Sequence, residues 1–306
     1  MSERILVIKL GALGDFILAF APFQAIRRHH PKAVITLLTT APFEPMARAS
    51  GWFDEIWIDV RPRFWQIGGW RALGRRLRGA RFDRVYDLQT SDRSGWYFAL
   101  FGNDRPEWSG IVRGCSHPHR NPARDRLHTV ERQAEQLVAA GIPNVPLPEL
   151  GWFDADVTRF PLPRRFLLMV PGGARHRPAK RWPAERYGEL ARRLAARGIP
   201  PVVIGGSEES DAAAAILAAC SGAVSLIGGT SLLEVAGVAR RAAAAVGNDT
   251  GPMHIAAAVG CPSLVLFSAE SDPALCGQRG PIVTFLRRPE LRALAVDEVE
   301  AALRLR

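Results

Sequence analysis

Several common structural signals are missing from this 306-residue sequence. Its four cysteines show no close pairing, which excludes a disulfide framework and is typical of reduced thiols. The longest apolar stretch near the start, Phe16 to Phe23, is well short of a bilayer span. No signal peptide is evident, because residues 2–4 lead directly into a short strand pattern. We therefore expect a cytoplasmic protein whose membrane contact is peripheral.

Acidic residues are fewer than basic ones. The chain has 30 Asp and Glu against 40 Lys and Arg, a formal net charge of +10 to which arginine contributes most. Such a surplus favours acidic partners, namely nucleic acid, an anionic membrane surface or phosphorylated substrates. No nucleic-acid-binding motif and no aromatic–basic platform appears, so we expect no nucleic-acid partner.

Two kinds of ligand site are also missing. Cys115, His117 and His119 fit no common zinc spacing and lack a second pair of ligands, so we expect no metal site. A nicotinamide dehydrogenase would carry G-x-G-x-x-G after its first strand and an acidic residue at the end of its second. This sequence has G-A-L-G at the first place, and its second strand pattern ends at Thr39 and Thr40. That enzyme class is excluded.

What the sequence does contain is a repeated alternation of short apolar runs and helical patterns. One set extends from Arg4 to Leu88 and a second from Phe166 to Leu305. Continuous aliphatic runs that alternate with helices indicate a parallel sheet covered on both faces. Residues 103–126 have weak periodicity and are expected to form a loop.

The proline-rich segment 143–165 is the expected linker. We predict an α/β protein with two Rossmann-like doubly wound domains, residues 1–155 and 156–306, that face each other across a cleft. Ligands of such sheets bind beyond the carboxyl ends of the strands. The closing helix, residues 297–305, could pack back on the first domain.

The most informative stretch is VGNDTGPMHIAAAVGCPSLVLFS, residues 246–268. A strand ends near Asp249, Thr250 stands at an N-cap position, and Pro252 suits the first turn of a helix. Gly251 lets a ligand approach the backbone. The free N–H groups and the positive end of the helix dipole make an anion site. Helix capping alone, with Asp249 and His254 as local hydrogen-bond partners, explains the same residues.

A second informative stretch is KLGALGDF, residues 9–16, directly after the first apolar run. A glycine-bearing turn between a strand and a helix usually binds a phosphate. Asp15 closes this turn, and a carboxylate repels phosphate. Asp15 is therefore either a helix cap or a group with a different chemical task.

These stretches resemble glycosyltransferase family 9, the ADP-heptose:lipopolysaccharide heptosyltransferases and their relatives. The D-T-G-x-x-H segment is similar to the donor motif of that family, and RILVIKLGALGDFILAFAPFQAIRRHHP is similar to its opening. VPGGARHRPAKRWPAERYGELARRL and VVIGGSEES are similar to two further segments. The resemblance extends from residue 4 to residue 268 in the expected order.

The resemblance implies a GT-B fold and an inverting, metal-independent transfer that needs no cofactor. It places an acceptor site in the first domain and a nucleotide-sugar site, with ADP-heptose as donor, in the second. By this resemblance Asp15 is the general base, Lys180 meets the donor phosphate, and Glu208 or Glu209 binds the ribose. The implied donor residues are Gly172, Gly173, Ala174, Lys180, Glu208, Thr230, Ser231, Asp249, Thr250, Gly251 and His254.

The loop at Gly172–Ala174 departs from the family pattern, because it lacks the hydroxyl side chains that several members carry near the donor phosphates. It offers only backbone N–H groups. Phosphate binding is still expected, but the identity of the donor sugar stays open.

On the acceptor side, Gly11 and Gly14 would let the acceptor approach the turn. The basic stretch WRALGRRLRGAR, residues 70–81, adds Arg71 and Arg75 beside Trp65. It could bind the phosphates of a lipopolysaccharide core or an anionic inner membrane surface. A solvated arginine-rich helix face explains the same pattern.

Three functions remain open at this point. The first is transfer of a heptose from ADP-heptose to a lipopolysaccharide-type acceptor, by a cytoplasmic enzyme peripheral to the inner membrane. The second is transfer within the same family from another nucleotide sugar or to another acceptor. The third is a catalytically silent binding or scaffold protein.

Overall fold

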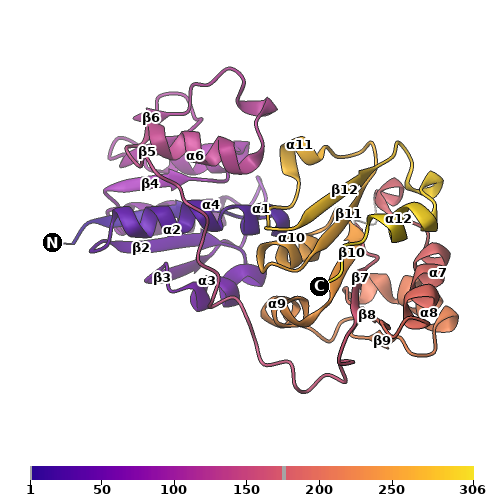
Figure 1. Cartoon of the computed structure of the whole chain (residues 1–306). Coiled ribbons are helices and arrows are strands. Elements are labelled where there is room, and N and C mark those ends of the chain that lie inside the picture. The colour runs from indigo at the N-terminus through magenta and orange to yellow at the C-terminus, as the bar shows by residue number, and fades with distance from the viewer. Residues whose placement is uncertain (1, 174–176) are drawn as a thin grey trace. The chain divides into compact units, whose positions relative to one another are not determined.

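The computed structural model describes residues 2–173 and 177–306, and it divides into two compact units, Met1–Glu149 and Leu150–Arg306 (Figure 1). Each unit holds one six-stranded sheet. The expected boundary between residues 155 and 156 falls inside the second unit. Among the described residues, no helix has the length and apolar character needed to cross a bilayer.

The first sheet has the strand order β3-β2-β1-β4-β5-β6, and its pairings are parallel. The order reverses between β1 and β4, where Ile5 pairs with Ile35 on one side and Arg84 on the other. The strands are β1 (Arg4–Ile8), β2 (Val34–Thr39), β3 (Glu55–Ile58), β4 (Arg84–Asp87), β5 (Glu107–Gly110) and β6 (His117–Pro118). The helices are α1 (Leu13–Leu18), α2 (Phe20–His29), α3 (Glu44–Ser50), α4 (Ile67–Gly79), α5 (Asp92–Leu100) and α6 (Thr129–Ala139).

The second sheet repeats this topology, with the order β12-β11-β10-β7-β8-β9 and parallel pairings. Here the order reverses between β7 and β10. The strands are β7 (Leu167–Val170), β8 (Pro201–Val203), β9 (Val224–Ser225), β10 (Ala244–Asn248), β11 (Ser263–Phe267) and β12 (Val283–Arg287). The helices are α7 (Ala184–Ala195), α8 (Ser210–Ala219), α9 (Leu232–Arg241), α10 (Gly251–Ala258), α11 (Pro273–Cys276) and α12 (Val296–Ala302).

Continuous apolar strands let each sheet be covered on both faces. In the first unit, α4 contacts α5, and α2 contacts α6. Leu6 and Ile8 pack with Leu77 of α4 and Phe98 of α5. Neighbouring strand residues point to opposite faces, so Ile5, which is fully buried, faces the other layer.

The core of the second unit forms in the same way. Met169 and Val246 of the sheet pack with Leu190 of α7 and with α12 through Val299. The closing helix α12 packs on α7 of its own unit. Residues 143–165, the expected linker, contain no helix or strand, and the division between the two units falls within them.

Two helices, α1 and α2, follow β1 and meet at Ala19. One local expectation was wrong. The expected loop at 103–126 contains β5 and the edge strand β6, which the sequence did not reveal because both are short and polar. Trp108 of β5 is nevertheless fully buried against Phe98 and Phe101.

Candidate functional site

The main candidate site lies at the carboxyl ends of β7, β8, β9 and β10, at the point where the strand order of the second sheet reverses. Ligands of doubly wound sheets bind at this place. The loops after these strands enclose a hollow of about 670 Å³. Eight predicted donor residues line it: Gly172, Gly173, Lys180, Glu208, Thr230, Asp249, Thr250 and Gly251.

Two of the residues that line this hollow form an ion pair. Lys180 Nζ donates to Asp249 Oδ2 at 2.8 Å, although 69 residues separate them in sequence. Gln278 Nε2 donates to the other oxygen, Asp249 Oδ1, at 3.1 Å. The two charged side chains are only 12% and 9% exposed, so little water screens the pair.

The pKa of Asp249 lies below its usual range. Burial alone would raise it, but the hydrogen bond and charge of Lys180 lower it, helped by a hydrogen bond from Ser271 and the charge of His254. Asp249 is therefore ionised at neutral pH and holds the Lys180 ammonium in place. A ligand phosphate that reaches this ammonium meets a charge already fixed in position.

Asn248, at the end of β10, is a residue that the sequence analysis missed. Its Oδ1 accepts from Trp182 N at 3.0 Å and from the Tyr187 hydroxyl at 3.1 Å. Its Nδ2 donates to Pro171 O at 2.8 Å and Gly172 O at 2.9 Å. This fully buried amide ties the loop after β7 to the segment that carries Lys180. The motif contained it, but its neighbours were not predictable from spacing.

Glu208 and Glu209 both line the hollow but have different surroundings. Glu209 Oε2 accepts from Gly206 N at 2.8 Å. A Cβ at Gly172 would stand 3.1 Å from the Glu209 carboxyl carbon, and a Cβ at Gly205 would stand 2.9 Å from Glu209 Cβ. Glu209 therefore stabilises the turn that follows β8, and its side chain leaves room only for glycine at positions 172 and 205. Glu208, in contrast, is exposed to solvent.

Helix α10 begins at the floor of the hollow. Thr250 occupies the N-cap position, but its hydroxyl donates to Asn248 O at 3.2 Å, and across the described residues no side chain caps the helix. The first-turn N–H groups and the positive end of the helix dipole therefore favour an anion there. His254 lies in the first turn, buried, where its charge acts on Asp249.

The remaining predicted donor residues are placed differently. Thr230 lines the hollow, whereas Ser231 is not among the lining residues. The Ser231 hydroxyl accepts from Glu234 N at 3.2 Å and caps α9. Ala174 lies outside the described residues. Arg177 also lines the hollow and adds a positive charge that the sequence analysis did not single out.

In the first unit, Asp15 lies in the first turn of α1, and its side chain is partly exposed. Its charge acts on Lys9, a buried residue directly after β1 whose Nζ donates to Leu88 O at 3.1 Å. Burial lowers the pKa of Lys9, while the charges of Asp15 and Asp87 oppose this effect. The sequence did not reveal the role of Lys9, because a single lysine after an apolar run is normally expected to be exposed to solvent.

Gly11 and the ends of β1, β2 and β3 surround a second hollow of about 590 Å³. Gly11 has φ +130°, and a Cβ there would stand 3.3 Å from the Phe43 ring, so both conformation and space favour glycine. Gly14 lies inside α1. Arg71 and Arg75 lie on α4, and both are exposed.

The Cys115 group does not form a shared site. His119 Nε2 lies 3.1 Å from Glu135, while His117 Nε2 lies 3.5 Å from Glu107. Over residues 2–173 and 177–306, no cluster of three or more His, Cys, Asp or Glu side chains is suited to a metal ion.

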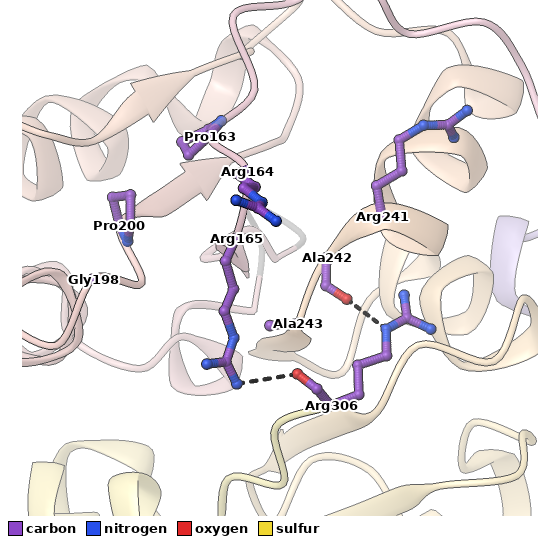
Figure 2. A pocket seen from close by; sticks show the side chains of 9 residues that line it. All are labelled: Pro163, Arg164, Arg165, Gly198, Pro200, Arg241, Ala242, Ala243 and Arg306. Carbon is purple, nitrogen blue, oxygen red and sulfur yellow. Dashed lines mark hydrogen bonds between the residues drawn. The ribbon is translucent and has the colours of Figure 1, made fainter.

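A larger hollow, of about 710 Å³, lies at the amino ends of the strands of the second sheet (Figure 2). Arg306 Nε donates to Ala242 O at 2.9 Å, and Arg165 Nη2 donates to Arg306 O at 3.1 Å. Arg306 Nη2 also donates to Ala239 O at 3.1 Å, near the end of α9. These guanidinium groups satisfy backbone carbonyls, so we assign this hollow a structural role.

Comparison with known proteins gives consistent matches. The model of glycosyltransferase family 9 (heptosyltransferase) matches residues 70–290. Lipopolysaccharide heptosyltransferase 2 of Salmonella typhimurium is 30% identical over 292 residues, which are 88% of this chain and 83% of that protein. Lipooligosaccharide heptosyltransferase 2 of Haemophilus influenzae is 36% identical over 292 residues, or 88% and 84% of the two chains.

A solved Escherichia coli heptosyltransferase with ADP superposes with a TM-score of 0.78 at 20% identity, covering 97% of this chain and 98% of that one. This likeness shows the fold. It agrees with the prediction of an α/β, GT-B protein made of two Rossmann-like doubly wound units.

Proposed function

The chain belongs to glycosyltransferase family 9, the heptosyltransferases, and we propose that it moves a heptose from ADP-heptose to a lipopolysaccharide core or related glycan. The observation that carries this proposal is the Lys180–Asp249 pair at the start of α10, inside a hollow formed by the loops after four strands. A fixed ammonium beside free helix N–H groups suits a diphosphate.

The donor would occupy this hollow along its length. Its diphosphate would lie against Lys180, Gly172, Gly173 and the N–H groups from Gly251 onward. Glu208, which is exposed and lines the hollow, would accept hydrogen bonds from the ribose hydroxyls. The other donor contacts in the proposal are Thr230, Ser231, Asp249, Thr250 and His254.

The proposed reaction inverts the anomeric carbon. The acceptor hydroxyl oxygen attacks that carbon, and the bond from the carbon to the diphosphate oxygen breaks. The hydroxyl proton passes to the Asp15 carboxylate, and the electron pair leaves with ADP. Lys180 and the α10 amides stabilise the negative charge that develops on the diphosphate. In this proposal no divalent ion is required.

On the acceptor side, Gly11 and Gly14 would let the sugar approach the turn that carries Asp15. The exposed guanidinium groups of Arg71 and Arg75 would meet acceptor phosphates. We place the enzyme in the cytoplasm, peripheral to the inner membrane, where a membrane-bound acceptor can be reached.

A thermal-shift panel of nucleotides and nucleotide sugars tests this function. ADP-heptose and ADP should raise the Tm of the wild type, because a ligand that binds only the folded state stabilises it. The Lys180→Ala variant should lose most of this shift. A larger Tm shift with another nucleotide sugar would identify that sugar as the donor instead of ADP-heptose. No Tm shift with any nucleotide would favour a catalytically silent scaffold protein.

A further inference from the structure

The first unit displays an unusual group of apolar side chains in the segment that connects β3 to α4. Val60, Phe64, Trp65 and Ile67 are 82%, 77%, 56% and 60% exposed. Large side chains rarely stay this exposed together unless a partner covers them. We name residues 60–66 the Trp65 loop.

Contacts with α4 and α5 fix the backbone of the Trp65 loop. Trp70 Nε1 donates to Arg63 O at 3.0 Å, and Arg93 Nη2 of α5 donates to Pro62 O at 3.0 Å. A Cβ at Gly69 would stand 2.8 Å from Pro62 Cβ, so α4 packs directly on the loop. The apolar tip is therefore fixed outward, and its insertion into a partner costs little conformational entropy.

Positive charge surrounds this tip. Between Asp59 and Asp83 the sequence has seven arginines and no acidic residue. Ile67, Arg71 and Arg75 follow one another at intervals of four on α4, which places them on one exposed helix face. An aromatic tip flanked by a row of cations matches the interface of a bilayer with anionic headgroups, where aromatic rings and basic side chains concentrate.

We propose that the Trp65 loop inserts Phe64 and Trp65 into the headgroup region of an anionic bilayer, while Arg71 and Arg75 bind lipid phosphates at its surface. The hollow that contains Gly11 is also lined by Val60 and Arg61. Insertion of the loop brings this hollow to the bilayer surface. If the proposed function holds, a lipid-anchored acceptor is then presented to the enzyme at the place where it reacts.

Vesicle co-sedimentation tests this proposal and requires neither donor nor turnover. The wild type should sediment with vesicles of phosphatidylcholine mixed with phosphatidylglycerol, and much less with phosphatidylcholine alone. Phe64→Ser/Trp65→Ser should lower the partition coefficient at least about tenfold. Arg71→Gln/Arg75→Gln should lower it roughly twenty-fivefold on anionic vesicles only, since each cation contributes about fivefold.

The matched control is Val138→Ser/Leu147→Ser, which removes two exposed apolar side chains of the same unit that lie outside the Trp65 loop. It should bind vesicles like the wild type. Brominated lipids should quench wild-type fluorescence more than that of Trp65→Phe, which retains vesicle binding. Circular dichroism confirms that each variant is folded.

Three outcomes overturn the proposal. Unchanged vesicle binding by the Phe64→Ser/Trp65→Ser variant excludes insertion. Equal quenching of wild type and Trp65→Phe places Trp65 outside the lipid. A wild-type dimer by light scattering that becomes a monomer in the Phe64→Ser/Trp65→Ser variant, without vesicle binding, assigns the patch to a second copy of the chain. Loss of transferase activity with intact vesicle binding bears on the proposed function alone.

Discussion

Lys180 Nζ lies 2.8 Å from Asp249 Oδ2, and both side chains are almost fully withdrawn from solvent. Removing one partner leaves the other charge buried and unpaired. Lys180→Met should therefore lower the free energy of unfolding by about 3 kcal/mol in urea denaturation, and it should also weaken ADP binding in calorimetry.

The double variant Lys180→Met/Asp249→Asn separates these two effects. It should recover most of the lost stability, because no charge stays buried alone. ADP affinity should remain low, because the ammonium is still missing. Recovery of ADP binding in the double variant would show that Lys180 only compensates Asp249.

Asn248 should matter for stability more than its size suggests. Asn248→Ala removes bonds to Trp182 N, the Tyr187 hydroxyl and two backbone carbonyls. Several buried groups lose a partner at once, so we expect a loss of about 3 kcal/mol, against about 1 kcal/mol for Tyr187→Phe. Urea denaturation measures both. Equal losses in the two variants would contradict the role of Asn248 as the tie between the loops.

We expect Glu208 to contact the ligand and Glu209 to stabilise the fold. Glu209→Gln weakens a charge-assisted bond to Gly206 N and should lower stability by about 1 kcal/mol. Glu208→Gln should raise the Kd for ADP about tenfold. The reverse pattern, measured by thermal shift and calorimetry, would assign the ribose to Glu209.

Asp87 gives the first unit a specific pH dependence. Burial raises the pKa of this carboxyl to about 6, against hydrogen bonds from Thr90, Ser94 and Gln89 and the charge of Lys9, which lower it. An unfolded Asp ionises near about 3.9. The folded chain thus holds the proton between about pH 4 and pH 6, and the stability from this group is lost as pH rises through that window.

Asp87→Asn remains neutral and keeps an oxygen that can accept from Gln89 N and Thr90 N. Its free energy of unfolding relative to wild type should therefore increase by up to about 3 kcal/mol from pH 4 to pH 7. Urea denaturation at both pH values measures the difference. A difference that does not change with pH would mean that Asp87 titrates normally.

Some features of the fold and of the candidate site are predictable from the sequence, and others are not. The parallel sheets followed from continuous apolar strands. The hollow lined by Lys180 and Asp249 lies where short motifs at strand ends predict a ligand site, because such ends meet at one edge of a sheet. The strand that contains Trp108 was missed because a strand of four mostly polar residues is too short to show a periodic pattern. The ties made by Asn248 and Lys9 depend on partners 61 to 79 residues away, and spacing in one sequence does not report such contacts.

The central claim is heptosyl transfer with Asp15 as the base, and it is tested most directly by mass spectrometry of the acceptor glycan. Wild-type protein, ADP-heptose and a truncated lipopolysaccharide acceptor are incubated in EDTA beside Asp15→Asn. The account predicts one added heptose and released ADP for the wild type. For Asp15→Asn it predicts a rate lower by at least about a hundredfold, with ADP affinity unchanged. Equal rates in the two proteins, or no transfer by the wild type unless Mg²⁺ is restored, would contradict it.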